Sequence, residues 1–180
     1  SNRGLIVSME SGESLAWKIR REMERSRLKT VYLSDSENAK NLTYYSLLSE
    51  LLKGALITYI NLHGNANLFA QSQEGSPILT YSDVPFIPPM VVLTLSCETC
   101  AFSSLETPLA SIAYRFIDRG AIAYIGSTSL EYSGEEYGST YPEHMIHMLL
   151  QGEPIGEVVR IINNIKISQG REVPKLILIG

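Results

Sequence analysis

Short apolar segments alternate with longer amphipathic segments along the whole chain. The apolar segments are rich in β-branched residues and bounded by turn residues, which is typical of buried strands. They cover residues 4–9, 29–33, 55–62, 90–95, 121–125 and 175–179. The amphipathic segments predict a helix to about residue 27 after capping residues at 11–14, and helices over residues 42–52, 107–119, 141–150 and 154–167. This alternation predicts an α/β fold whose mostly parallel sheet is covered by helices on both faces.

Two segments in the middle of the chain carry more specific expectations. Residues 65–76 are rich in Asn, Gln, Ser and Gly, and prolines follow at 77, 85, 88 and 89. This composition predicts a long loop with a short hairpin at 78–81, and we expect the loop to border the site. Further on, Thr107 and Pro108 form a suitable N-cap and first-turn pair for a helix that ends at Gly120. That helix is expected to bury Leu109, Ile112, Ala113 and Phe116.

Length and composition limit the possible functions. With 180 residues, 44% of them hydrophobic, the chain can form one domain with a sizeable core. A net charge of −4 without a basic cluster argues against nucleic-acid binding. Polar residues interrupt the apolar segments, so no membrane span is expected. We expect residues 1–180 to be a single domain from a longer protein, because Ser1-Asn2 resembles a remnant of tag removal and the chain stops directly after a predicted strand.

The ends of two predicted strands carry the main candidate site. The strand at 55–62 is followed by His63-Gly64, and the strand at 90–95 is followed by Ser96-Cys97. Open α/β sheets place their sites at the carboxyl edge of the strands. Two neighbouring strands would therefore present an imidazole and a thiol side by side.

Nucleophilic catalysis by cysteine requires a thiol beside an imidazole. A free cysteine is mostly protonated at neutral pH, and a nearby imidazole lowers its pKa or accepts its proton. His63 is the only histidine at a predicted strand end. The amides of Gly64 and Cys97 are candidates for an oxyanion hole, since glycine lets the backbone approach a substrate. From spacing alone, a histidine satisfied elsewhere and an inert buried thiol remain the alternative.

Other residues raise the question of metal or redox chemistry. Cys97 and Cys100 form a C-x-x-C pair, and His144 and His147 could supply two nitrogen ligands to zinc. The spacing of the histidines is shorter than in zinc fingers and there is no second cysteine pair, so two ordinary helical histidines are favoured. A thioredoxin-like role is disfavoured because that motif belongs near the start of a βαβ unit. We therefore expect neither a metal nor another cofactor.

A third predicted strand, at 121–125, also ends in small polar residues. These are followed by a loop over residues 130–140 that is rich in glutamate and tyrosine. An acidic wall in this loop, with Glu131 as a candidate, would select a basic substrate side chain. A loop that is merely solvated is the alternative interpretation.

The order of these features resembles the caspase and haemoglobinase clan of cysteine peptidases, and within it the gingipain-like peptidases. The resemblance runs from about Leu52 to Gly180, whereas the first 49 residues match less clearly. It rests on several pieces of sequence, which are Leu52 to Ala55 leading into Tyr59 to Gly64, Leu95 to Thr99 with Phe102, Gly120 to Thr128, and Pro154 to Glu157.

This resemblance implies a caspase-like three-layer α/β/α sandwich that hydrolyses a peptide or protein substrate. Cys97 would be the nucleophile and His63 the general base or acid, with a thioester acyl-enzyme and the oxyanion held by the Gly64 and Cys97 amides. The loop after Ser127 and Thr128 would help to form the primary specificity pocket, for which a basic P1 residue is expected. Additional domains and a secreted or cell-surface location are further implications.

Two positions depart from the gingipain pattern. Gingipain-like sequences usually have Gly-His-Gly around the histidine, and here Leu62 replaces the first glycine. The larger side chain of Leu62 is expected to narrow the approach to the oxyanion hole. Cys100 stands at a usual glycine and adds a thiol that can be oxidised. The segment from Ser96 to Thr99 also resembles the CHAT domains, which are caspase-like modules of intracellular regulatory proteins. A catalytically inactive binding or scaffold module in the cytoplasm is therefore the alternative function.

Overall fold

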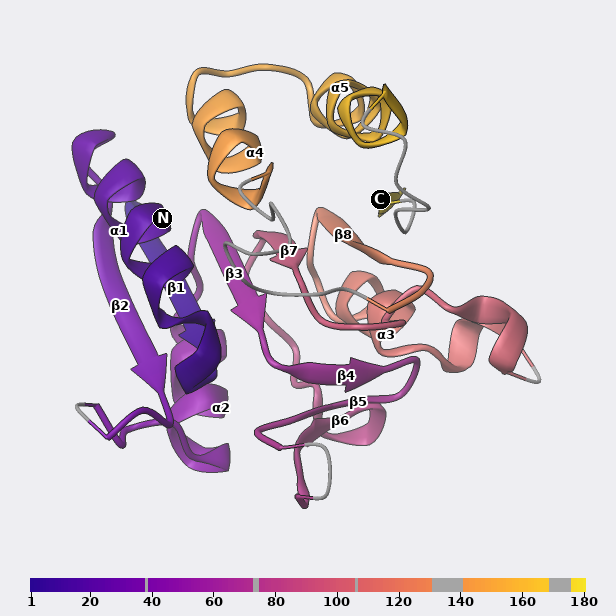
Figure 1. The fold of residues 1–180 in the computed structure, drawn as a ribbon. Helices are drawn as coiled ribbons and strands as arrows, with labels where there is room; N and C mark the ends of the chain where they lie inside the picture. Colours follow the sequence, from indigo (N-terminus) through magenta and orange to yellow (C-terminus); the bar gives the residue numbers. More distant parts are fainter. Residues whose placement is uncertain (38, 73–74, 106, 131–140, 169–175) are drawn as a thin grey trace.

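A six-stranded sheet forms the centre of the molecule (Figure 1). The computed structural model describes the whole chain except residues 38, 73–74, 106, 131–140 and 169–175. The strands of this sheet are β1 (Arg3–Ser8), β2 (Lys29–Ser34), β3 (Ile57–Asn61), β7 (Val91–Thr94), β8 (Ala123–Ser127) and β9 (Leu176–Ile179). Their spatial order is β2-β1-β3-β7-β8-β9, with β9 antiparallel to β8 and the others parallel. The predicted mostly parallel sheet is confirmed.

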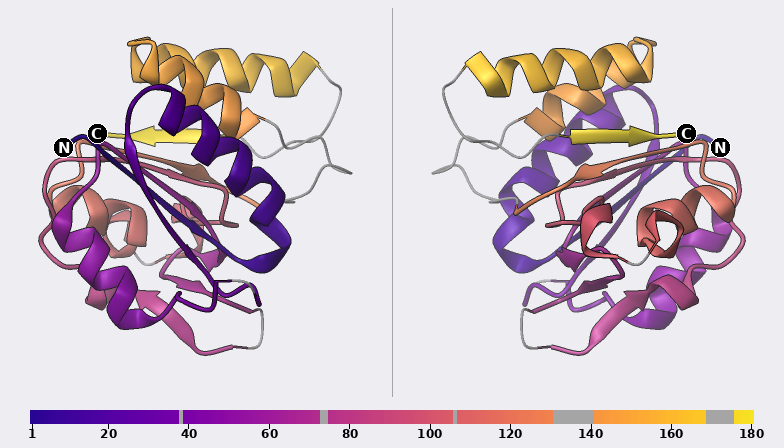
Figure 2. Two further views of the ribbon diagram at one scale, coloured as in Figure 1. Left: turned by 90° about the vertical axis from the view of Figure 1, so that its left-hand side faces the viewer. Right: turned by 90° about the vertical axis from the view of Figure 1, so that its right-hand side faces the viewer.

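Helices cover both faces of the sheet (Figure 2). One face carries α1 (Glu13–Arg25), α4 (Tyr141–Leu150) and α5 (Ile155–Ser168), and the other carries α2 (Tyr44–Lys53) and α3 (Ile112–Asp118). Strand side chains alternate between the faces, so Tyr59 of β3 packs with the first group and Ile60 with the second. The result is the expected three-layer sandwich. No helix in the described part of the chain is long and apolar enough to cross a membrane.

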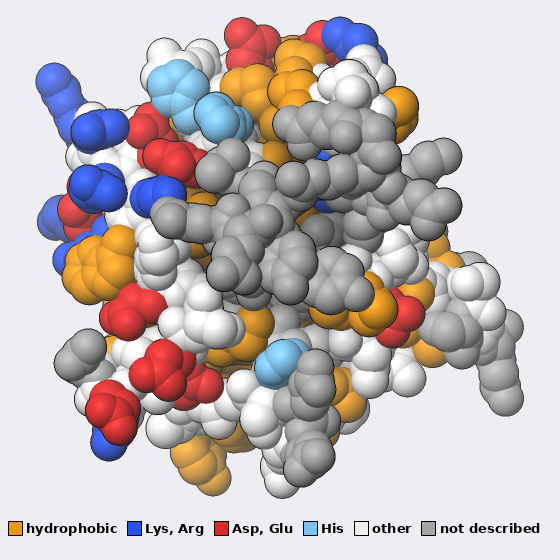
Figure 3. Space-filling view, in the orientation of Figure 1, with side chains coloured by type: hydrophobic (Ala, Val, Ile, Leu, Met, Phe, Trp, Pro, Cys, Tyr) orange, Lys and Arg blue, Asp and Glu red, His pale blue; other side chains and the backbone are white. Residues whose placement is uncertain are grey.

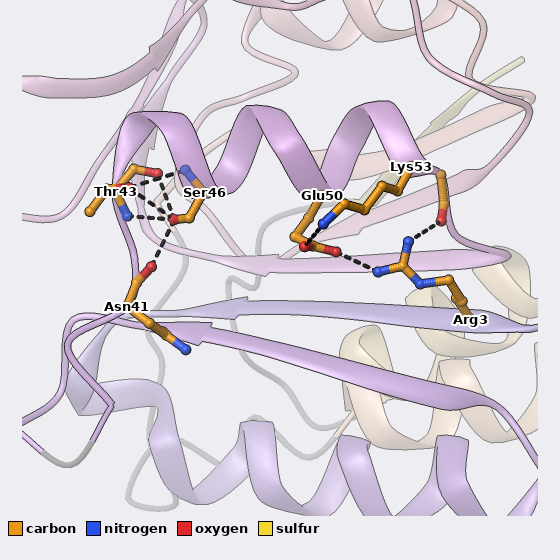
Figure 4. A network of polar contacts seen from close by, with 7 residues as sticks. Arg3, Asn41, Thr43, Ser46, Glu50 and Lys53 are labelled. Atoms are coloured by element: carbon orange, nitrogen blue, oxygen red, sulfur yellow. Dashed lines mark hydrogen bonds and ion pairs between the residues drawn. The ribbon is translucent and has the colours of Figure 1, made fainter.

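The helix α2 shows how local polar contacts fix an element in place. Its N-cap, Thr43, accepts a hydrogen bond from the Ser46 N–H (3.1 Å), and Ser46 Oγ accepts one from the Thr43 N–H (2.8 Å). This reciprocal capping box satisfies two amides that the helix start leaves unpaired. Near the other end, Glu50 accepts hydrogen bonds from Lys53 and from Arg3 of β1 (Figure 4). These contacts tie α2 to the amino edge of the sheet.

The segment after β3 differs from its prediction. It contains β4 (His63–Asn65), β5 (Leu68–Ala70) and β6 (Pro77–Thr80), which form a small antiparallel sheet in that order. The expected long loop with only a hairpin at 78–81 is therefore wrong. Phe69 and Leu79 anchor this small sheet in the core on the α2 and α3 side. Strands this short carry too few alternating positions for the sequence pattern to reveal them.

The helix expected over residues 107–119 is shorter than predicted. A 3₁₀ turn at Pro108–Ala110 comes first, and α3 begins only at Ile112. Ser111 is the N-cap, and its Oγ accepts a hydrogen bond from the Tyr114 N–H (3.2 Å). Leu109, which was expected to be buried, is 66% exposed. The prediction failed because Thr107 and Ser111 are both acceptable caps in sequence, and packing selects the later one.

Candidate active site

His63 and Cys97 lie at the carboxyl edge of two adjacent strands. β3 and β7 pair in parallel from Ile57 opposite Val91 to Ile60 opposite Thr94. The segments that follow these two strands therefore leave the sheet at the same edge. His63 is the first residue of β4, and Cys97 lies in the turn that follows β7. Both residues are partly exposed.

Gly64 brings the two strand ends into contact. A Cβ atom added at Gly64 would lie 2.9 Å from Ser96 Cβ, 3.1 Å from the Cys97 carbonyl oxygen and 3.1 Å from Thr99 Cγ2. Contacts this short mean that no larger residue fits without displacing the backbone. The His63-Gly64 segment thus packs directly against the segment that carries the thiol.

The backbone after Cys97 adopts an uncommon conformation. Glu98 has a φ of 54°, in the left-handed region that residues with a Cβ seldom occupy. The Ala101 N–H then donates to the Glu98 carbonyl (2.9 Å) and closes a turn. Such strain persists where the surrounding structure enforces it, and it is frequent at functional loops.

Hydrogen bonds join this turn to the chain that leaves β8. The Glu98 N–H donates to the Ser129 carbonyl (3.0 Å), and the Cys100 N–H donates to the Ser127 carbonyl (2.9 Å). Ser127 is fully buried, and its Oγ accepts a hydrogen bond from the Ser129 N–H (3.3 Å). Three strands therefore contribute to the site, namely β3, β7 and β8.

The structure describes two of the three residues that are candidates for the substrate pocket. Ser127 and Thr128 lie at the end of β8, beside the turn that begins at Cys97. Ser127 is buried and Thr128 is partly exposed, so Thr128 is the more accessible of the two. Glu131 lies outside the described residues, together with the rest of the predicted acidic wall.

The two cysteines lie in different environments. Cys100 is fully buried, and burial raises the pKa of its thiol to about 12 even though hydrogen bonds with the Thr99 side chain and the Gly126 backbone oppose the shift. Cys97 is partly exposed. Because the thiolate is the nucleophile, Cys100 is unsuited to attack a substrate at neutral pH.

The two histidines of α4 lie on the surface, away from His63 and Cys97 (Figure 3). Both are exposed, and His147 Nδ1 shares a hydrogen bond with Glu22 Oε1 of α1 (2.6 Å). Figure 3 shows this pair of histidines over α4, apart from the third histidine of the chain. Among the described residues, no group of three or more His, Cys, Asp or Glu side chains could hold a metal ion. The zinc hypothesis thus finds no support in this part of the molecule.

Comparison with known proteins assigns the family. The model of peptidase family C25 matches residues 3–176. The chain belongs to peptidase family C25. This match confirms the gingipain-like resemblance and extends it over the first 49 residues, where the sequence motifs were unclear. No curated protein matches the chain in sequence.

Two gingipain structures share the fold of this family C25 chain. The TM-score is 0.61 at 15% identity with gingipain R, an Arg-specific cysteine proteinase. It is 0.60 at 12% identity with the complex of the pro- and mature domains of RgpB from Porphyromonas gingivalis. Both matches cover 85% of this chain but only 37% and 38% of the gingipain chains, respectively. This family C25 chain therefore spans well under half the length of the solved relatives.

Two features of the site were not foreseen. One is the left-handed conformation of Glu98, which depends on the bonds to the chain after β8. The other is the position of Ser96, which packs against Gly64. A polar residue at the end of a buried apolar strand is the signal that could have singled out Ser96, because such residues stay buried only when they are hydrogen-bonded.

Proposed function

We propose that this chain is a cysteine endopeptidase domain with Cys97 as nucleophile and His63 as general base and acid. The observation that carries the proposal is the close packing of Gly64 against Ser96 and the Cys97 carbonyl. This packing supports the dyad because the segment that carries His63 lies against the segment that carries Cys97. Membership of family C25 supports the same reaction class.

The reaction proceeds through a thioester. His63 accepts the Cys97 proton, and the thiolate attacks the carbonyl carbon of the scissile peptide bond. The amides of Gly64 and Cys97 stabilise the resulting oxyanion. His63 then protonates the leaving amine, and the acyl group remains on Cys97. A water molecule that gives a proton to His63 attacks the thioester, the bond between the carbonyl carbon and the Cys97 sulfur breaks, and the carboxylic acid product leaves. His63 then returns the proton to the sulfur, which restores the thiol and the neutral imidazole.

We propose further that Thr128 and Glu131 help to select a basic P1 side chain. Two observations support this. The chain that leaves β8 is hydrogen-bonded to the Cys97 turn, and one solved relative is named an Arg-specific proteinase. A peptide library tests the proposal, and Glu131→Gln should reduce cleavage after Arg more than cleavage after Leu. Equal or better cleavage after apolar residues would contradict it.

Mass spectrometry of the intact protein after brief exposure to a peptidyl chloromethyl ketone tests the dyad. We expect one adduct, located on Cys97, in the wild type. Cys97→Ala should abolish it and His63→Ala should slow it greatly, because the imidazole activates the thiol. Cys100→Ala is the matched control and should retain the adduct, since the buried Cys100 plays no part in the reaction.

Two outcomes would contradict the dyad. One is a wild type that acquires no adduct. The other is slow labelling of Cys97 and Cys100 alike, at a rate that does not depend on His63. Either result would favour a caspase-like binding or scaffold module without peptidase activity.

A further inference from the structure

The backbone ladder between β3 and β7 stops just before the site. Its last bond runs from the Leu95 N–H to the Ile60 carbonyl (2.9 Å). Parallel ladders continue with evenly spaced bonds, so the next would join the Leu62 N–H to the Leu95 carbonyl. The Leu62 N–H instead donates to the side-chain Oγ of Ser96 (3.2 Å). The Ser96 hydroxyl thus replaces the Leu95 carbonyl as acceptor at the point where the segments after β3 and β7 separate.

Ser96 is held in this position by several contacts. It is fully buried, and its N–H donates to Thr94 Oγ1 (2.9 Å). Its Cβ packs against Gly64, where an added Cβ would come within 2.9 Å. Ser96 therefore touches Leu62 through its hydroxyl and Gly64 through its Cβ. These are the two residues on either side of His63.

We propose that Ser96 is a positioning residue that sets the distance between the His63 and Cys97 segments. The inference rests on the proposed function, because it assumes that these two residues react together. A serine hydroxyl extends beyond its own backbone, so it can keep the two strand ends connected after the ladder has ended. Reacting groups must be held within a few tenths of an ångström of a productive geometry, and small displacements reduce rates strongly.

The Ser96→Ala variant tests this role through the reactivity of Cys97. Alkylation of Cys97 by chloroacetamide, followed across a range of pH, should be about tenfold slower at neutral pH. The apparent pKa of Cys97 in this profile should rise, because a displaced imidazolium stabilises the thiolate less. Hydrogen exchange should also show faster exchange of the Leu62 amide, which loses its acceptor.

Ser111→Ala is the matched control. Ser111 is another fully buried serine, and its hydroxyl caps α3 through the Tyr114 N–H. The variant should lower the melting temperature by losing this cap. It should leave the alkylation profile and the exchange of the Leu62 amide unchanged. A shift shared by both variants would mean that Ser96 acts on general stability, and this result would overturn the proposal.

Two further outcomes separate this inference from the dyad itself. A folded Ser96→Ala variant with the wild-type profile would overturn the role of Ser96 while leaving the dyad intact. A wild type whose Cys97 alkylation does not depend on His63 would overturn both.

If Ser96→Ala does not fold, Thr94→Val removes the acceptor of the Ser96 N–H but keeps the Ser96 hydroxyl. Slower alkylation with a raised pKa would then support the proposal, and an unchanged profile would overturn it.

Discussion

A glycine near each end of strand β3 lies in close contact with a neighbouring segment, but the two contacts have different roles. Before the strand, Gly54 has a φ of 73°, and an added Cβ would lie 2.9 Å from Pro88 Cβ. After the strand, a Cβ added at Gly64 would lie 2.9 Å from Ser96 Cβ. Each glycine lets one segment press against the next. Only the second glycine lies beside a histidine and a partly exposed cysteine.

The surrounding charges strengthen this contrast. At the amino end, Glu50 accepts hydrogen bonds from Lys53 and Arg3. Burial by itself would raise the pKa of Glu50, but these two cations outweigh it and hold the pKa below its ordinary value of 4.5. These charges compensate one another and stabilise the fold. The carboxyl end instead presents an imidazole and a thiol. The two edges thus share a closely packed glycine and differ in the side chains around it.

The largest expected effect is that of Gly64→Ala on activity. The added methyl must displace Ser96 or the Cys97 backbone, and we expect alkylation of Cys97 and any peptide cleavage to fall about 100-fold. Rates of chloromethyl ketone labelling measure this loss. Thermal unfolding is the control, since the melting temperature should change far less than the rate. A Gly64→Ala variant with wild-type kinetics would contradict the packing described for the site.

Gly54→Ala should produce the opposite pattern. An alanine at positive φ, pressed against Pro88, is expected to lower the free energy of unfolding by about 2 kcal/mol. Urea denaturation measures this change. The rate of Cys97 labelling should remain that of the wild type at temperatures where the variant is folded. A stable variant with impaired labelling would show that the two ends of β3 are coupled.

Glu50→Gln should have a smaller effect that depends on pH. The pKa of Glu50 is lower in the folded chain than in the unfolded one, so its ionised form stabilises the fold. This contribution is complete above the ordinary pKa of 4.5 and disappears as the pH falls through the lower folded-state value. We expect a loss of only about 1 kcal/mol at neutral pH, since Lys53 is exposed and Arg3 is partly exposed. Urea denaturation at several pH values measures it, and a loss that persists in acid would contradict the ion-pair explanation.

The smallest effect concerns the second thiol. With a pKa of about 12, Cys100 should not react with iodoacetamide in the native protein at neutral pH. Mass spectrometry should find one modified cysteine before unfolding and two in denaturant. Cys100→Ala, as the control, should leave native labelling at Cys97 unchanged. Rapid native labelling of Cys100 would mean that the turn after Cys97 opens readily.

The parts of the fold that were predicted correctly are those with long, regular patterns. The helix expected at 141–150 has those bounds as α4, and the buried strands were found because their apolar runs are bounded by turn residues. The small sheet from β4 to β6 was missed because its strands are only three or four residues long. The helix start at 107 was wrong because two cap residues compete in sequence, and the choice depends on which apolar side chains reach the core.

The sequence by itself determined the class of the fold, the family resemblance and the two strand ends that carry His63 and Cys97. It could do so because periodicity and motif order are local properties of the chain. Only the tertiary structure decided which contacts join those ends. The packing of Gly64 on Ser96, the hydrogen bond from Leu62 to Ser96 and the burial of Cys100 all link residues that pattern alone does not pair. They depend on distances between strands, which arise only when both faces of the sheet have packed.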